Sequence, residues 1–141
     1  MRVIAGRWRG HRLQTLPGLE VRPTADRVRE ALFSILGEAL AGAEVADLCC
    51  GSGALGIEAL SRGAAHATFV DDRKKACETI AANLARARLA ASATVRAATM
   101  SSDFGGACWS FISTACQALV TPSSTGVLAI SSNISTPPKV C

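Results

Sequence analysis

The sequence has no apolar run near the ~18 residues that a membrane span needs, and its 141 residues include only two histidines. Its six cysteines contain no Cys-x-x-Cys pair, so the common zinc-binding spacing is absent. His11 and His66 stand too isolated for a metal site or a catalytic triad. Arginines interrupt the N-terminus before the apolar segment of a signal peptide could form: Arg2, Arg7, Arg9 and Arg12. These absences predict a cytoplasmic protein with no membrane segment and no metal.

Positive charge is concentrated at the N-terminus. The net charge is +4, but residues 1–29 hold seven arginines against Glu20 and Asp26, a local charge of +5. Planar guanidinium groups match phosphate oxygens with paired hydrogen bonds. Beside Trp8 and His11, this arginine cluster indicates contact with a nucleic-acid backbone. On charge alone, a solvated basic surface is an equally good interpretation.

A glycine-rich turn at residues 47–56 (DLCCGSGALG) is the most informative stretch. Gly51 and Gly53 permit a tight turn and a close approach of the backbone to a ligand. The helix expected after the turn presents unpaired N–H groups and the positive end of its dipole. This arrangement suits a nucleotide-like cofactor, although a turn that serves the fold alone has the same pattern.

Two acidic residues flank this turn and narrow the choice of cofactor. Asp71 ends the next apolar run, about 20 residues past the glycines, where an acid can bind a ribose diol. Asp47 belongs to an expected buried strand, where an unpaired carboxylate is costly unless it faces a cationic amino acid moiety. The pair favours S-adenosylmethionine. A dinucleotide-dependent oxidoreductase is the alternative, supported only by the Gly51-x-Gly53-x-x-Gly56 pattern.

Hydrophobic periodicity predicts an α/β fold with a β-α-β-α-β order, the first half of a doubly wound parallel sheet. Strands are expected at 44–49, 66–70 and 93–97, and helices at 54–62 and about 73–89. Ligands of such sheets bind at the carboxyl ends of the strands. Gly63 is expected as the C′ residue of the first helix, and Glu58 and Arg62 as a surface pair on it.

An amphipathic helix is also expected before the sheet, with Thr24 as its N-cap and Gly37 or Gly42 at its end. The predicted buried face comprises Val28, Ala31, Leu32, Ile35 and Leu36. The predicted solvent face comprises Arg27, Arg29 and Glu30. Residues 2–16 are expected to form either a short hairpin or an extended arm.

Three ordered motifs resemble the RsmD family: RVIAGRWRG at 2–10, RPTADRVREALF at 22–33 and DLCCGSGALGIEALSRGA at 47–64. The resemblance covers about residues 1–90. Members of that family methylate the N2 amine of guanine 966 in the 16S ribosomal RNA of the bacterial small subunit. The resemblance therefore implies a Rossmann-like, S-adenosylmethionine-dependent RNA methyltransferase, acting as a monomer.

The resemblance also implies roles for individual residues. The methionine half of S-adenosylmethionine would be surrounded by Asp47, Gly51, Ser52 and Gly53, and its ribose hydroxyls bound by Asp71. The segment that contains Thr24 would close over the site. Ribosomal RNA would be contacted by Arg2, Arg7, Arg9, Arg12 and Arg22.

The chain departs from the family after residue 99. The family holds the guanine amine with an Asp/Asn-Pro-Pro-aromatic tetrad, but the only Pro-Pro here is Pro137-Pro138, between Thr136 and Lys139. No catalytic residue is therefore identified, and the chain is expected to be inactive. A catalytically silent module that binds RNA or cofactor is the alternative function.

The composition changes at the same place. Residues 100–141 hold two charged residues, whereas residues 1–99 hold 24. This change indicates a shifted reading frame, with a divergent tail or a linker as alternatives. Three segments follow: a basic arm (1–21), the cofactor-binding half (22–99) and an atypical tail (100–141), in which 107–120 suggests a buried helix or strand.

Overall fold

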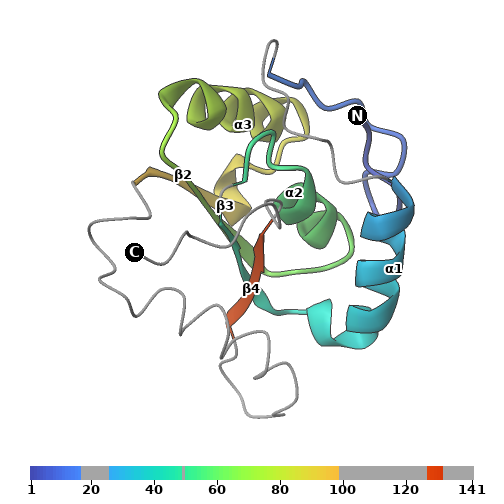
Figure 1. Ribbon diagram of the computed structural model, residues 1–141. Coiled ribbons are helices and arrows are strands. Elements are labelled where there is room, and N and C mark those ends of the chain that lie inside the picture. Colours follow the sequence, from blue (N-terminus) through green and yellow to red (C-terminus); the bar gives the residue numbers. More distant parts are fainter. Residues whose placement is uncertain (17–25, 49, 99–126, 132–141) are drawn as a thin grey trace, which may run out of the picture.

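A parallel four-stranded sheet lies at the centre of the computed structural model, which describes residues 1–16, 26–48, 50–98 and 127–131 (Figure 1). In spatial order its strands are β3 (Ala93–Ala97), β2 (His66–Asp71), β1 (Glu44–Leu48) and β4 (Val127–Ser131). The helices are α1 (Asp26–Leu36), α2 (Ala54–Ser61) and α3 (Lys74–Arg86), with short 3-10 helices η1 (Gly37–Leu40) and η2 (Ala90–Ser92). The predicted α/β fold and its β-α-β-α-β order are confirmed.

The core lies between the sheet and helices α2 and α3. Along β2, every second side chain is buried, and Phe69 is fully enclosed beside Ile80 of α3. A Cβ atom added at Gly56 of α2 would lie 2.4 Å from the Phe69 ring. Gly56 is therefore a packing glycine that lets α2 approach β2 closely. No helix among the described residues is long and apolar enough to cross a membrane.

Helix α2 ends in a Schellman motif, as its glycine predicts. The Gly63 N–H donates to Leu60 O (3.2 Å) and the Ala64 N–H to Ala59 O (3.1 Å). Gly63 has φ +111°, which a residue with a Cβ rarely adopts. The expected C′ role of Gly63 is confirmed.

Strand β4 was not predicted. It pairs parallel with β1, Val127 opposite Glu44 and Ser131 opposite Leu48. The sequence VLAIS shows neither the alternation of a half-buried strand nor the period of a helix. Parallel strands covered on both faces need no alternation, so the pattern gives no signal for β4. The side of β1 with which β4 pairs is known only from the assembled sheet. Residues 107–120 lie outside the described residues.

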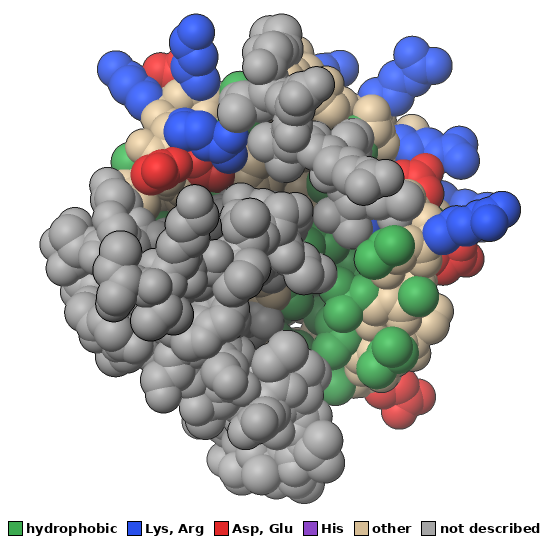
Figure 2. All heavy atoms as spheres, in the orientation of Figure 1, with side chains coloured by type: hydrophobic (Ala, Val, Ile, Leu, Met, Phe, Trp, Pro, Cys, Tyr) green, Lys and Arg blue, Asp and Glu red, His purple; other side chains and the backbone are tan. Residues whose placement is uncertain are grey.

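The predicted burial of α1 is only partly right. Leu36 is buried and Leu32 packs partly against the core, as expected, but the other residues of the predicted buried face are exposed and Arg29 of the predicted solvent face is buried. The side chains that face the protein are those of Arg29, Phe33 and Leu36, whereas Val28 is 52% and Ile35 is 83% exposed. Figure 2 shows hydrophobic side chains gathered over α1 on the outer surface. The cause is Arg29, whose Nη2 donates to Arg2 O (2.9 Å) and to Asp26 Oδ1 (2.7 Å), drawing this face inward.

Residues 1–13 form a hairpin rather than an extended arm. Arg2 and Arg12 form an antiparallel bridge, the Val3 N–H donates to His11 O (3.0 Å), and Val3 and Leu13 are buried. The hairpin lies beside α2 and α3 (Figure 1). Its small apolar surface is therefore buried against the helices, since it has no core of its own.

Glu58 of α2 holds this hairpin in place. Its carboxylate is fully buried and accepts hydrogen bonds from the Ile4 N–H (2.7 Å) and the Ala5 N–H (2.9 Å). It also accepts from Arg62 Nε at 2.9 Å. The expected pair with Arg62 exists, but its expected surface position is wrong, because the hairpin covers it.

Candidate functional site

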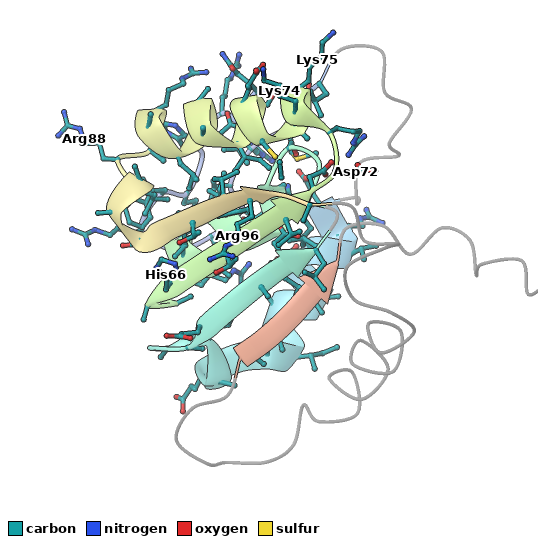
Figure 3. The ribbon with its side chains drawn as sticks, turned by 90° about the vertical axis from the view of Figure 1, so that its left-hand side faces the viewer. His66, Asp72, Lys74, Lys75, Arg88 and Arg96 are labelled. Carbon is teal, nitrogen blue, oxygen red and sulfur yellow. The ribbon has the colours of Figure 1, made fainter. Side chains whose placement is uncertain are left out.

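The glycine turn follows β1 and lies at the carboxyl ends of the strands. Figure 3 shows Asp72 at the same end of the sheet, directly after β2. There the Gly51 N–H donates to Asp71 Oδ2 (2.9 Å) and the Gly56 N–H donates to Asp47 Oδ2 (2.9 Å). The structure therefore brings together the acids and the glycines that the sequence singled out. Thr24 and Arg22 lie outside the described residues.

The two turn glycines have different reasons to be glycine. Both have positive φ, +55° at Gly51 and +75° at Gly53. A Cβ atom at Gly53 would press on Ile80 (3.1 Å) and Phe69 (3.2 Å), so this glycine serves the core. At Gly51 a Cβ atom would meet, among the described residues, only Arg73 Nη2, at 4.0 Å. Gly51 therefore leaves room for a ligand on its side of the turn.

Asp47 is a buried carboxyl group that is only half satisfied. Its Oδ2 caps the N-terminus of α2 through Gly56, because the N-cap residue Gly53 has no side chain to do so. Its Oδ1 is buried and has no hydrogen-bond partner within the part of the chain that the structure describes. Burial raises the pKa of Asp47 to about 7; the Gly56 hydrogen bond lowers it and the charge of Asp71 adds to the rise. The site therefore has one unused acceptor that a cation would satisfy.

Asp71 has the opposite electrostatic environment. Its Oδ1 accepts from Arg73 Nε (2.9 Å) and its Oδ2 from Arg73 Nη2 (3.0 Å). Burial opposes ionisation, but the hydrogen bonds of Arg73 and Gly51 outweigh it and hold the pKa of Asp71 below its ordinary value. Sequence reasoning missed Arg73, whose only signal is its position two residues after the acid. A ribose would have to share Asp71 with this guanidinium.

Asn83 of α3 ties the turn to the hairpin, and sequence reasoning missed it as well. The side chain is buried, its Nδ2 donates to Ser52 O (3.1 Å) and Gln14 O (3.1 Å), and its Oδ1 accepts from the Gln14 N–H (2.8 Å). Ser52 Oγ also lies 3.4 Å from Met1 Sδ. An asparagine next to the apolar face of α3 was the available signal.

The cysteine beside the turn has no reactive character. The Cys50 thiol donates to Val70 O (3.3 Å), and burial raises its pKa well above the ordinary value. Burial also raises the pKa of the Cys77 thiol. Both side chains therefore stay protonated, as packing residues do.

The hairpin presents its arginine side chains to solvent: Arg2, Arg7, Arg9 and Arg12 are all exposed. The Arg7 guanidinium lies over the Trp8 ring at 5.3 Å from its centroid, and Arg2 Nε lies 3.9 Å from Asp26 Oδ2. This surface can meet an extended polyanion without rearrangement of the fold.

The chain is similar in sequence to proteins of one family. Residues 1–108 match the family described as Conserved hypothetical protein 95. The Ribosomal RNA small subunit methyltransferase D of Escherichia coli (strain K12) is 45% identical over 85 residues, which cover 60% of this chain and 43% of that protein. The protein of that name from Haemophilus influenzae is 44% identical over 84 residues, covering 60% and 44%. The chain thus spans less than half the length of these curated relatives.

Solved structures show the same fold. The structure of yhhF from Escherichia coli aligns with a TM-score of 0.63 at 38% identity, covering 70% of this chain and 52% of that one. A hypothetical protein from Thermus thermophilus aligns with a TM-score of 0.61 at 28% identity, covering 84% and 63%. Because the family match extends over residues 1–108, the chain belongs to the Conserved hypothetical protein 95 family, the RsmD family that its motifs resemble.

Proposed function

We propose that this chain is the cofactor-binding and RNA-binding part of an S-adenosylmethionine-dependent methyltransferase that acts on the N2 amine of a guanine in 16S ribosomal RNA. The observation that carries the proposal is the buried carboxyl group of Asp47, in the strand that leads into the glycine turn. Its Oδ1 has no hydrogen-bond partner among the described residues. The family match over residues 1–108 contains this turn.

The residues present fit this cofactor. Asp47 Oδ1 would accept from the ammonium group of its amino acid moiety, the turn at 51–53 would lie against that moiety, and Asp71 would take the ribose hydroxyls. S-adenosylmethionine supplies an electrophilic methyl group when bound. A dinucleotide fits less well, because the Gly56 N–H, at the helix N-terminus where a pyrophosphate would bind, already donates to Asp47.

The hairpin supports an RNA substrate. Its arginines face solvent. Met1 of the hairpin contacts Ser52 of the glycine turn, and Gln14, directly after the hairpin, is joined to the same turn through Asn83. RNA bound along the hairpin would therefore lie against the element that forms the cofactor site. Arg2, Arg7, Arg9, Arg12 and Arg22 are the residues we propose for this contact.

We further propose that the chain binds its ligands without transferring a methyl group. The amine of guanine is a weak nucleophile, and enzymes hold an extruded base by stacking and edge contacts. The Asp/Asn-Pro-Pro-aromatic tetrad that would do so is absent from the sequence. The family match ends at residue 108, near the point at which the composition changes.

Ligand binding and transfer are tested separately. S-adenosylhomocysteine at 100 times its Kd should stabilise the purified chain by about 2.7 kcal/mol, whereas NAD should not shift the melting temperature. Labelled S-adenosylmethionine should transfer no methyl group to small ribosomal subunits. Stabilisation by NAD but not by S-adenosylhomocysteine would support the oxidoreductase alternative, and measurable transfer would contradict the proposed inactivity.

The tail is tested by its coding DNA. We expect that resequencing codons 90–141 and translating all three frames will place an Asp/Asn-Pro-Pro-aromatic tetrad in a frame other than the present one. That result would assign residues 100–141 to a shifted frame. If no frame contains the tetrad, the tail is genuine and the chain is a binding module alone.

A further inference from the structure

A cleft of about 220 Å³ lies where the tip of the N-terminal hairpin meets the end of α2. It is lined by Arg7 and Trp8 of the hairpin, Gly63 and Ala64 after α2, and Leu89 and Ser92 after α3. The floor is apolar, since Ala64 and Leu89 are buried, while the rim carries a guanidinium and a hydroxyl group. A flat, partly polar ligand suits this combination.

The cleft and the cofactor turn lie at opposite ends of the sheet. Gly63 precedes β2 and Ser92 precedes β3, so the cleft is at the end where strands begin, near the labelled His66 and Arg88 (Figure 3). Asp72, beside the cofactor turn, lies at the other end. The six residues of β2 separate the two ends by about 17 Å. A ligand in the cleft is therefore not the group that receives a methyl.

The hairpin tip is held in place by its backbone. The Arg7 N–H donates to Ser61 O (2.8 Å), and the Trp8 N–H donates to Ser61 Oγ (3.0 Å). The Trp8 ring packs on the core and carries the Arg7 guanidinium over it. The Arg7 guanidinium is thus positioned on the Trp8 ring before any ligand arrives, which reduces the entropy lost on binding.

We propose that this cleft binds one unpaired RNA nucleotide, its base stacked on the outer face of the Arg7 guanidinium, which the Trp8 ring supports, and its phosphate beside the arginines of the hairpin tip. Aromatic rings and guanidinium planes are the groups on which proteins stack unpaired bases. The exposed Arg88 adds positive charge at the same end. The inference rests on the proposed RNA substrate, and it places a second contact several nucleotides from the target guanine.

The test compares variants of the full chain in binding to a labelled ten-nucleotide single-stranded RNA and to the same strand in a duplex, by fluorescence anisotropy. Trp8→Ala removes the ring that holds the Arg7 guanidinium in place, so it should weaken single-strand binding about tenfold and should remove the preference over duplex. Trp8→Phe should retain most of both. Arg7→Ala should lower the slope of log K against log salt by about 0.7, an effect that loss of stacking alone would not produce.

Lys75→Ala is the matched control, because this exposed lysine lies at the cofactor end of α3 (Figure 3). It should leave the preference for single strands unchanged. Stabilisation by S-adenosylhomocysteine, measured on every variant, shows that each one is folded. If Trp8→Ala binds the single strand as tightly as the parent chain, this inference fails alone. If the parent chain binds no RNA, the proposed RNA substrate fails with it.

Discussion

Asp47→Asn is expected to weaken binding of S-adenosylhomocysteine by at least 30-fold at pH 8 while leaving the chain folded. The Asn carbonyl can still accept from the Gly56 N–H, so the cap on α2 survives. The negative charge that would pair with the cofactor ammonium is lost, and truncating one partner of a buried charge pair costs about 2–5 kcal/mol. Isothermal titration of both proteins measures the change.

The same residue should make binding depend on pH. With its pKa at about 7, Asp47 is about one-tenth ionised at pH 6 and nine-tenths at pH 8. If only the carboxylate binds the ammonium, the apparent affinity of the parent chain rises about tenfold across this range. Asp47→Asn should show no such rise. An equal pH dependence in both proteins would contradict the assignment of Asp47 to the ammonium.

The stability of the ligand-free chain should respond in the opposite direction. Asp47 holds its proton more tightly in the folded chain, where its pKa is about 7, than in the unfolded chain, at 3.8. Its contribution is therefore fully present below pH 4 and is lost as the pH rises through 7, on the order of 4 kcal/mol in all. At pH 8 the Asn variant should be more stable than the parent, because it carries no buried charge. The gain should be about 2 kcal/mol rather than the full 4, because the buried amide of the variant stays partly unpaired.

Asp71→Asn is the matched control for the stability measurement. The pKa of Asp71 is lowered, so its contribution is present at neutral pH and is lost as the pH falls through the folded value. Removing its charge should therefore destabilise the chain at pH 8, where Asp47→Asn stabilises it. Urea unfolding measures both effects. If both variants are destabilised at pH 8, the Asp47 carboxylate is stabilised by a positive group, which would contradict its raised pKa.

How far the sequence predicts this molecule depends on the kind of pattern involved. Alternation and glycine spacing place β1, β2, β3 and the glycine turn, because each of these depends on residues close together in the chain. Helix α1 shows the limit of periodicity. Both the predicted stripe through Val28 and Ile35 and the observed stripe through Arg29 and Phe33 have helical spacing. Hydrophobicity selects the first, whereas the hydrogen bond from Arg29 to the backbone of Arg2 selects the second.

Buried acidic residues also differ in whether the sequence predicts their place. Asp47 and Asp71 are found from the sequence because they stand at fixed distances from the glycines. The burial of Glu58 was not predicted, since its partners are the backbone N–H groups of Ile4 and Ala5, more than 50 residues away. The pair with Arg62 is visible in the sequence, but the backbone donors that bury Glu58 have no side chain to reveal them. The role of Glu58 therefore required the docked hairpin.

Gly6→Ala and Gly10→Ala should differ in cost even though both glycines have almost the same backbone conformation, φ +84° and +83°. An alanine at Gly10 meets no atom of the residues that the structure describes within 4 Å, so it carries only the penalty of a positive φ, about 1 kcal/mol. At Gly6 the added Cβ would lie 2.0 Å from Ser61 O, a backbone atom that the end of α2 holds in place. The hairpin must then separate from α2.

If the hairpin separates, the Glu58 carboxylate loses the hydrogen bonds from the Ile4 and Ala5 N–H groups. Gly6→Ala should therefore lower the free energy of unfolding by about 3 kcal/mol or more. Urea unfolding of the two variants measures the difference. Gly6→Ala should also weaken RNA binding at the Trp8 cleft, because the Ser61 hydrogen bonds position that ring. Equal costs for the two substitutions would mean that the hairpin does not dock on α2. In that case the arginines of the hairpin would no longer be fixed relative to the cofactor turn.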